Sequence, residues 1–553
     1  MTRCVRVRGI GASVLLLSLA IPAQDSWGPL PAGPDTVGFR TEIRLDRGRR
    51  YRTELDDGAT YGGSGKAARP ILVNLWYPAV PSDTPPMPYR AYFDIGSDDP
   101  DVDRFAQAIS AYAADVSATE MLGKAVADLD DVEGALWRRF LDLSTRAHPD
   151  AAPRPGPFPC VVYHSGAGSS FEDNSAFCEY LASHGYVVVG SAYPAANGRR
   201  FGVDAGDGSV RDMEFLARYV GELPYVDWRH IAFAGHSAGA QASMRAMLRP
   251  DCPADALVLF DSTADYYSLR IPNFRYLTEP ALQQPGAYVR PMLVIAGPEA
   301  TFEMCDQLTA ADRTYLTVPE LGHNEFILQG VLRLRVQGWL QEARSDSEGA
   351  EARARDVARE PDVVRLFVET CEAARLFLDA ELCGARGPCD ARWAAWAKNA
   401  LGGAAPRVAL APAGQAGPAP YDPSAGGPPS PRQLRQVMAQ RGVEGLIASL
   451  ESHRDREPQS PVYDSTMLWG SVLYDLAATE RLDDAKALHA WLAEIGVDGT
   501  SALRFLARME VMSKRNDRAQ DMLRVALSIN PKDARALQKM AELEASPAAS
   551  TGR

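Results

Sequence analysis

The chain has 553 residues, of which 46% are hydrophobic and 23% are charged. This length, with this proportion of hydrophobic and charged residues, predicts two to four domains with sizeable cores. The formal net charge is -13 at pH 7, and because an acidic surface repels phosphate backbones, we expect no nucleic-acid partner.

The N-terminal segment has the layout of a secretory signal peptide. Arg3, Arg6 and Arg8 precede an apolar stretch that ends in the small residues of AIPA. This stretch is too short to span a membrane comfortably, although an uncleaved N-terminal anchor is the alternative. We therefore expect residues 1–23 to be cleaved as a signal peptide and the mature protein to be secreted or periplasmic.

Residues 24–345 are predicted to form one α/β domain. After a polar stretch at 24–70, short apolar runs recur, and most of them lack polar alternation, as strands do when both faces of a sheet are covered. Helical patterns separate several runs, which predicts a mostly parallel sheet with helices on both faces. The expected strands lie at 70–79 and from residues 158, 186, 230, 256, 292 and 314, with helices at 175–185 and 212–223.

Residues 85–155 interrupt the alternation of strands and helices. Apolar residues recur there at helical spacing, from Phe105 to Val116 and from Leu136 to Leu143. We expect a helical insertion. It is either a lid over an active site or a helical layer that packs on the sheet.

The last part of the chain differs in composition from the α/β part. Residues 346–401 are expected to form a helical extension. Residues 402–431 are dominated by Pro, Gly and Ala, which predicts a flexible linker. We expect the linker to separate the α/β part from a helical domain at 432–545 that can be removed without loss of chemistry.

The C-terminal helical segment contains a repeat. Trp469, Leu503 and Leu537 are spaced by 34 residues, and so are Ala485 and Ala519. This period is typical of tetratricopeptide (TPR) helix pairs, and the segment resembles such repeats. The resemblance implies a surface for a protein partner. A plain helical bundle is the alternative.

Some of the cysteines that follow the signal peptide could pair as disulfides in an oxidising compartment. Cys383 and Cys389 have a spacing that suits a small closed loop, and Cys371 is a rival partner. We find no Cys/His cluster with metal-ligand spacing. We therefore predict no metal site, and the expected chemistry needs no cofactor.

The stretch FAGHSAGAQ, residues 233–241, joins a predicted strand to a predicted helix. Ser237 stands in it between Gly235 and Gly239. A strand that turns abruptly into a helix leaves room for only tiny neighbours around the turn, so this pattern predicts a nucleophile elbow, with a polar turn as the alternative. The N–H of Ala238 would then face a developing oxyanion.

A serine nucleophile needs a base and an acid that orients the base. His323 follows the last predicted strand and should lie at the carboxyl edge of the sheet, where such sites form. Asp261 follows the strand after the nucleophile strand, and Glu299 follows the next one. We prefer Asp261 because a short carboxylate immediately after a strand is better fixed, and we keep Glu299 as the alternative acid.

A second oxyanion donor is expected in the stretch VVYHSGAGSS. Its small residues allow the backbone to approach a substrate closely. We assign the role to the N–H of Ala167, with Gly166 as the fallback.

Five segments together resemble one known family. They are RPILVNLWYPA, FPCVVYHSGAGSS, LASHGYVVVGSAYP, GHSAGA and ELGHNEF, in this order. On these, residues from about 35 to 340 resemble an α/β-hydrolase of the platelet-activating-factor acetylhydrolase and dienelactone-hydrolase-like group. The family's oxyanion loop reads Ser-His-Gly, whereas this chain has His164-Ser165-Gly166.

The resemblance implies the α/β-hydrolase fold and an acid at Asp261. It also implies a serine carboxylic-ester hydrolase that acts on a small-molecule or lipid ester through an acyl-enzyme. Two alternatives stay open. One is a serine peptidase or amidase on the same fold, and the other is a non-catalytic TPR-type binding protein.

Overall fold

The structure is a computed structural model, and it describes most of the chain. The predicted signal peptide, most of the predicted linker and the Cys383–Cys389 loop lie outside the described residues, while Cys371 is a buried free thiol. The described ranges are 26–50, 68–193, 206–297, 299–318, 320–344, 349–382, 408–415, 431–454, 461–512 and 515–545.

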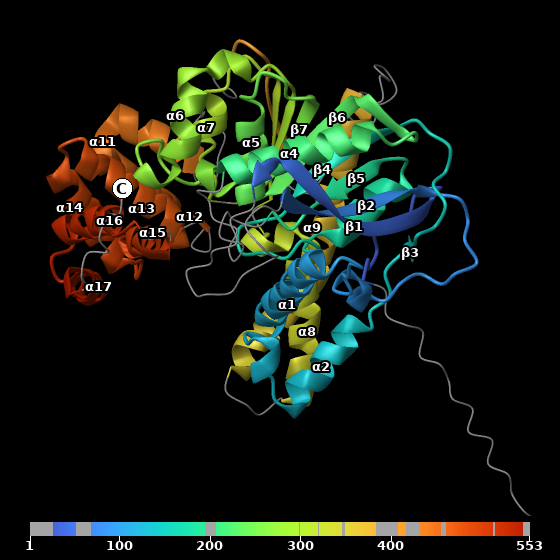
Figure 1. Ribbon diagram of the computed structural model, residues 1–553. Coiled ribbons are helices and arrows are strands. Elements are labelled where there is room, and N and C mark those ends of the chain that lie inside the picture. The colour runs from blue at the N-terminus through green and yellow to red at the C-terminus, as the bar shows by residue number, and fades with distance from the viewer. Residues whose placement is uncertain are drawn as a thin grey trace, which may run out of the picture.

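A sheet of ten described strands, in the order β10-β9-β8-β7-β6-β4-β5-β2-β1-β3, forms the centre of the molecule (Figure 1). Its middle, from β5 to β9, is parallel. The pairs β1–β2, β2–β5 and β9–β10 are antiparallel, and the short β3 joins β1 in parallel. The strands are β1 (Thr36–Arg50), β2 (Ala68–Ala79), β3 (Ala147–Pro149), β4 (Phe158–His164), β5 (Val187–Gly190), β6 (Val226–His236), β7 (Ala254–Phe260), β8 (Met292–Ala296), β9 (Arg313–Thr317) and β10 (Val408–Ala411).

Helices cover both faces of this sheet. None of the described helices is both long and apolar enough to cross a membrane. The helices are α1 (Pro100–Leu122), α2 (Asp131–Leu141), α3 (Ser175–Ser183), α4 (Gly206–Gly221), α5 (Ala238–Ala246), α6 (Arg275–Gln283), α7 (Glu303–Asp306), α8 (Leu328–Ala343), α9 (Ala350–Leu382), α11 (Pro431–Arg454), α12 (Pro461–Asp464), α13 (Thr466–Ala478), α14 (Leu482–Glu494), α15 (Ser501–Met512), α16 (Asn516–Ile529) and α17 (Ala534–Ala545).

The two faces of the sheet bury separate cores, which explains the absence of polar alternation in the central strands. In β4, Cys160 and Val162 pack with α4 and α5, whereas Val161 and Tyr163 pack with α3, α8 and α9. Because successive strand residues point to opposite faces, a strand covered on both sides must be apolar throughout. The mostly parallel sheet with helices on both faces confirms the predicted α/β-hydrolase fold.

Besides the short β3 in the predicted insertion, two strands arise where the sequence did not predict them. Residues 36–50, in the polar stretch 24–70, form β1 because they pair with β2 from Thr36 to Asp46 in continuous register. Residues 408–411, within the predicted flexible linker, form β10 along β9. The prediction of a flexible linker is therefore wrong for these four residues. Their pairing satisfies backbone groups of β9 that would otherwise be unpaired at the edge of the sheet.

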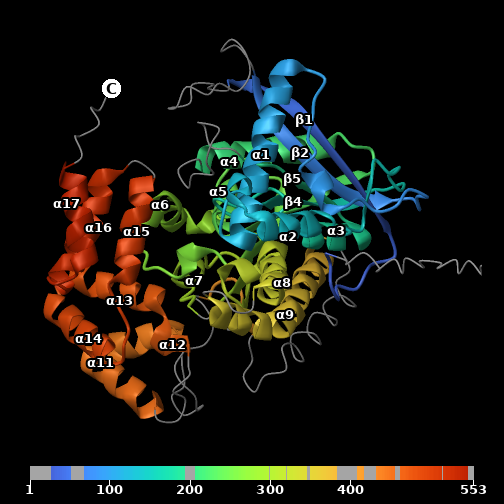
Figure 2. The ribbon, with the colours of Figure 1, turned by 90° about the horizontal axis from the view of Figure 1, so that it is seen from below.

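The predicted insertion forms a helical layer beside α8. Phe105 and Ile109 of α1 and Phe140 of α2 are buried in the same core as α8. The side-chain amide of Gln337 on α8 donates to the carbonyl of Met121 at 2.6 Å. Figures 1 and 2 show α1, α2 and α8 side by side.

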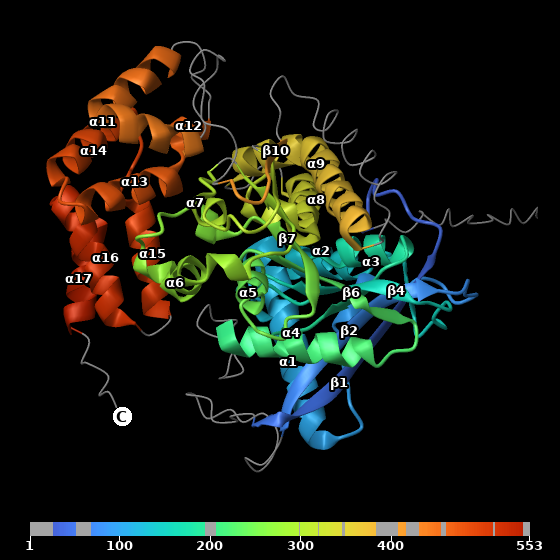
Figure 3. The ribbon, with the colours of Figure 1, turned by 90° about the horizontal axis from the view of Figure 1, so that it is seen from above.

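The C-terminal region is helical from α11 to α17. Trp469, Leu503, Ala485 and Ala519, which the 34-residue period relates, are fully buried. Leu537, the last member of the period, is 48% exposed, because it lies on α17, the last helix of the described chain. Figures 2 and 3 show these helices beside α6 and α7 of the α/β part, and their buried side chains belong to the same core as those of α4 and α5.

Candidate active site

Ser237 stands alone between β6 and α5. Its backbone has φ 54° and ψ -117°, a conformation that residues with a side chain rarely adopt and that costs about 1–3 kcal/mol. The N–H of Ser237 donates to the carbonyl of Phe260 on β7 at 2.9 Å. This bond ties the strained turn to the neighbouring strand, and a sharp, strained strand-to-helix turn is the backbone geometry of a nucleophile elbow.

The two glycines around Ser237 are required by backbone contacts. A Cβ atom on Gly235 would lie 2.4 Å from the carbonyl carbon of Gly239. A Cβ atom on Gly239 would lie 2.1 Å from the carbonyl oxygen of His164. Neither backbone can move away without breaking the strand-to-helix turn, so only glycine fits at both places.

The predicted oxyanion loop passes beside the serine. A Cβ atom on Gly166 would lie 3.4 Å from the Cβ of Ser237. The N–H of Gly166 donates to Asp173 Oδ2 at 3.4 Å, which favours the exposed Ala167 as the donor on this loop. Ala238 is the first residue of α5, where backbone N–H groups have no acceptor within the helix.

His323 and Asp261 come together at the carboxyl edge of the sheet. His323 Nδ1 lies 2.6 Å from Asp261 Oδ2. The other carboxylate oxygen of the fully buried Asp261 accepts the N–H of Gly297 at 2.7 Å and the hydroxyl of Tyr266. Those two donors leave Oδ2 for the imidazole and hold the carboxylate in place.

The alternative acid has a different neighbour. Glu299 is half-buried, and its carboxylate lies near the Ser465 side chain, at the start of α13. Burial raises the pKa of Glu299 from its ordinary value. Of the two predicted acids, Asp261 is the one that contacts His323.

His236 is a second histidine at this site to which the sequence analysis gave no role. Its Nε2 lies 2.9 Å from the backbone carbonyl of His323, and the two rings are 4.6 Å apart. Burial and the neighbouring His323 lower the pKa of His236 to about 3, so its ring is neutral. A neutral ring that faces a carbonyl must donate through Nε2, and this bond positions the backbone of His323.

Two buried carboxyl groups lie behind the predicted oxyanion loop. Asp173 accepts the hydroxyl of Tyr163 at 3.1 Å as well as the N–H of Gly166. Glu172 accepts the hydroxyls of Ser170 and Ser117 at 2.6 and 2.7 Å. Burial raises the pKa of Asp173 to about 8 and that of Glu172 to about 7, and the neighbouring Glu172 adds to the rise at Asp173.

The raised pKa makes stability depend on pH in a definite direction. Between pH 4 and pH 8 the folded protein holds a proton on Asp173 that the unfolded chain releases near 3.8, so stability falls as the pH rises. Asp173→Asn stays neutral and should reduce the loss between pH 5 and pH 8 by up to about 4 kcal/mol. Thermal unfolding at both pH values would show a smaller fall in Tm. The exposed Asp521→Asn should behave like the unmodified chain, and an unchanged pH dependence in Asp173→Asn would refute the assignment.

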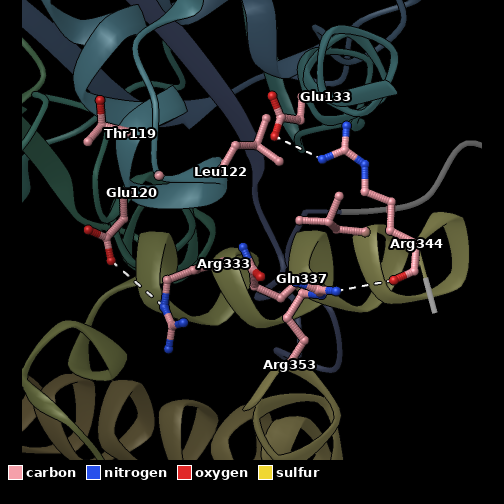
Figure 4. A pocket seen from close by; sticks show the side chains of 10 residues that line it. Thr119, Glu120, Leu122, Glu133, Arg333, Gln337, Arg344 and Arg353 are labelled. Atoms are coloured by element: carbon pink, nitrogen blue, oxygen red, sulfur yellow. Dashed lines mark hydrogen bonds and ion pairs between the residues drawn. The ribbon is translucent and has the colours of Figure 1, made fainter. Parts of the chain in front are cut away.

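A separate cavity lies between α1, α2 and α8. Its volume is about 560 Å³, and Arg333, Arg344 and Arg353 line it together with Glu120 and Glu133 (Figure 4). Ser237, His323 and Asp261 are not among its lining residues. Within the described ranges we find no group of three His, Cys, Asp or Glu side chains that could hold a metal ion.

Comparisons with known proteins give distant structural matches. Neither a protein-family model nor a curated protein matches the sequence. Among solved structures, the chain is similar to a ferulic acid esterase from Streptomyces cinnamoneus, with a TM-score of 0.44 and 20% identity over 70% of this chain and 99% of the other. It is also similar to a puromycin-hydrolyzing peptidase from Mycobacterium tuberculosis, with a TM-score of 0.32 and 14% identity over 62% of this chain and 39% of the other.

Proposed function

We propose that the protein is an exported serine hydrolase that cleaves carboxylic esters with Ser237, His323 and Asp261. The observation that supports it best is the 2.6 Å contact between His323 Nδ1 and Asp261 Oδ2, beside a serine on a strained elbow. A buried carboxylate that faces an imidazole nitrogen, with a serine on the adjacent strand end, is the arrangement that serine hydrolases share.

The proposed reaction has two steps. Ser237 Oγ attacks the ester carbonyl carbon while His323 Nε2 takes the hydroxyl proton, and Asp261 stabilises the imidazolium. The N–H groups of Ala238 and Ala167 bind the oxyanion. The alcohol leaves with the proton from His323, and a water molecule, activated by the same histidine, then hydrolyses the acyl-enzyme.

We infer a small-molecule or lipid ester as the substrate class. The proposal follows the resemblance of residues 35–340 to acetylhydrolase-like esterases. The same chemistry would cleave amides, so a peptidase or amidase is the competing function. The secreted or periplasmic location and a protein partner for the TPR-like helices belong to the same proposal and rest on the sequence patterns alone.

Active-site labelling and matched substrates test this function. We expect a fluorophosphonate probe to label the protein once, on Ser237, and nitrophenyl esters to turn over faster than nitroanilides with the same acyl groups. A series of acyl chain lengths would identify the preferred substrate. Comparable turnover of the anilides would favour an amidase, and a lack of labelling in folded protein would favour a non-catalytic binding protein.

A further inference from the structure

The loop that carries the acid has an inner side that faces the candidate active site. We call residues 261–274, after β7, the acid loop. Asp261 begins it, and Tyr266 donates its hydroxyl to the Asp261 carboxylate. The carbonyl of Asp265 accepts the N–H of Thr301 at 2.8 Å, which joins the acid loop to the loop after β8. The position of the acid therefore depends on where residues 265 and 266 lie.

The outer side of the acid loop contacts the C-terminal helices. Ser268, two residues after Tyr266, donates its N–H to Ser471 Oγ on α13 at 2.6 Å. Its hydroxyl donates to the carboxylate of Asp475, one turn further along α13. Ser268 and Ser471 are both buried. Further along the loop, the Asn273 side chain donates to the carbonyl of Leu506 on α15 at 3.3 Å.

An arginine from α11 completes this contact. Arg435 donates to Ser471 Oγ at 2.6 Å and to Asp475 Oδ2 at 3.1 Å, and it also pairs with Glu303 on α7. The side chains of Arg435 and Asp475 are each only 15% exposed. Since charges withdrawn from water are stable only when they are paired in good geometry, this group tolerates little displacement.

A second arginine fastens the neighbouring loop in the same way. Arg432 of α11 pairs with Asp306 at 2.6 Å, and its guanidinium lies 4.8 Å from the Phe302 ring and 4.6 Å from the Tyr315 ring. Phe302 follows Thr301, which is bonded to the acid loop. Both loops that surround Asp261 are thus held from outside by α11 and α13.

We propose that Arg435, Ser471 and Asp475 form a brace that positions the acid loop, and that catalysis depends on it. The C-terminal helices then act as a part of the hydrolase and are not a detachable module. This inference rests on the proposed function for its kinetic consequence. Displacement of a reacting group by about 1 Å can cost roughly 10²-fold in rate, so a loosened acid loop should lower kcat.

The test uses full-length Asp475→Asn and Ser268→Ala, singly and combined. We expect each single variant to lower kcat for a nitrophenyl ester about tenfold with little change in KM, because a brace that acts through the position of the acid affects the chemical step. Because both substitutions disrupt one contact, the double variant should lose less than the product of the two single effects. Asp484→Asn, an exposed carboxylate on α14, is the matched control and should keep full activity.

Hydrogen exchange gives a second measurement that does not need activity. Asp475→Asn should raise the exchange of backbone amides in residues 262–274, whereas Asp484→Asn should not. Unchanged exchange and unchanged kcat in a folded Asp475→Asn protein would overturn the brace. If the unmodified chain lacks esterase activity, the proposed function fails, while the exchange result still decides whether the brace holds the loop.

Discussion

Ser237→Ala is expected to abolish ester hydrolysis while the fold stays intact. The substitution removes only Oγ, and alanine leaves the backbone bond from residue 237 to Phe260 in place. In a serine hydrolase with an intact base and acid, loss of the nucleophile costs about 10⁶-fold in kcat. Steady-state turnover of the purified variant, with circular dichroism to establish folding, measures the effect.

The matched control for this variant is Ser243→Ala. Ser243 lies on α5, the helix that follows Ser237, and its hydroxyl donates to the carbonyl of Gly239 at 2.9 Å. Loss of this hydrogen bond to the preceding turn of the helix should leave esterase activity and labelling by the probe nearly unchanged. Turnover by Ser237→Ala within tenfold of the unmodified protein would refute the nucleophile assignment.

The second large effect is expected from Asp261→Asn. The amide oxygen can still accept from Gly297 and Tyr266, so the fold should survive. Its NH₂ group would then face His323 Nδ1 and favour the imidazole tautomer that cannot accept the serine proton at Nε2. Loss of the acid in a Ser-His-Asp site can lower kcat about 10⁴-fold.

Glu299→Gln provides the comparison for the acid. Glu299 lies near Ser465 instead of the imidazole, and glutamine has nearly the same size and shape as glutamate. We expect activity to change by less than about tenfold, since a carboxylate that does not orient the base contributes little to the transition state. If Glu299→Gln loses most of its activity and Asp261→Asn does not, the acid of the triad follows the later strand, β8.

Short sequence patterns were enough to predict the central strands and the elbow of the α/β part. The doubly buried strands appear as continuous apolar runs because each side chain faces a covered side of the sheet. The elbow at Ser237 could be predicted because a Cβ atom on Gly235 or Gly239 would collide with backbone atoms, so the constraint is visible in the choice of glycine itself. The preference for Asp261 over Glu299 also came from local geometry, and the contact with His323 agrees with it.

Other features depend on partners that are distant in the chain, and only the tertiary structure decided them. The strand at 408–411 exists because β9 offers it an edge, although its neighbours are rich in Pro and Gly. The predicted separability of residues 432–545 did not anticipate that the Arg435–Asp475 pair, whose side chains are each only 15% exposed, lies against the acid loop. In both cases nothing in the local sequence distinguishes these residues, and their structural role is set by the groups that they contact across the fold. A hydrogen bond or an ion pair depends on position in space and not on spacing along the chain.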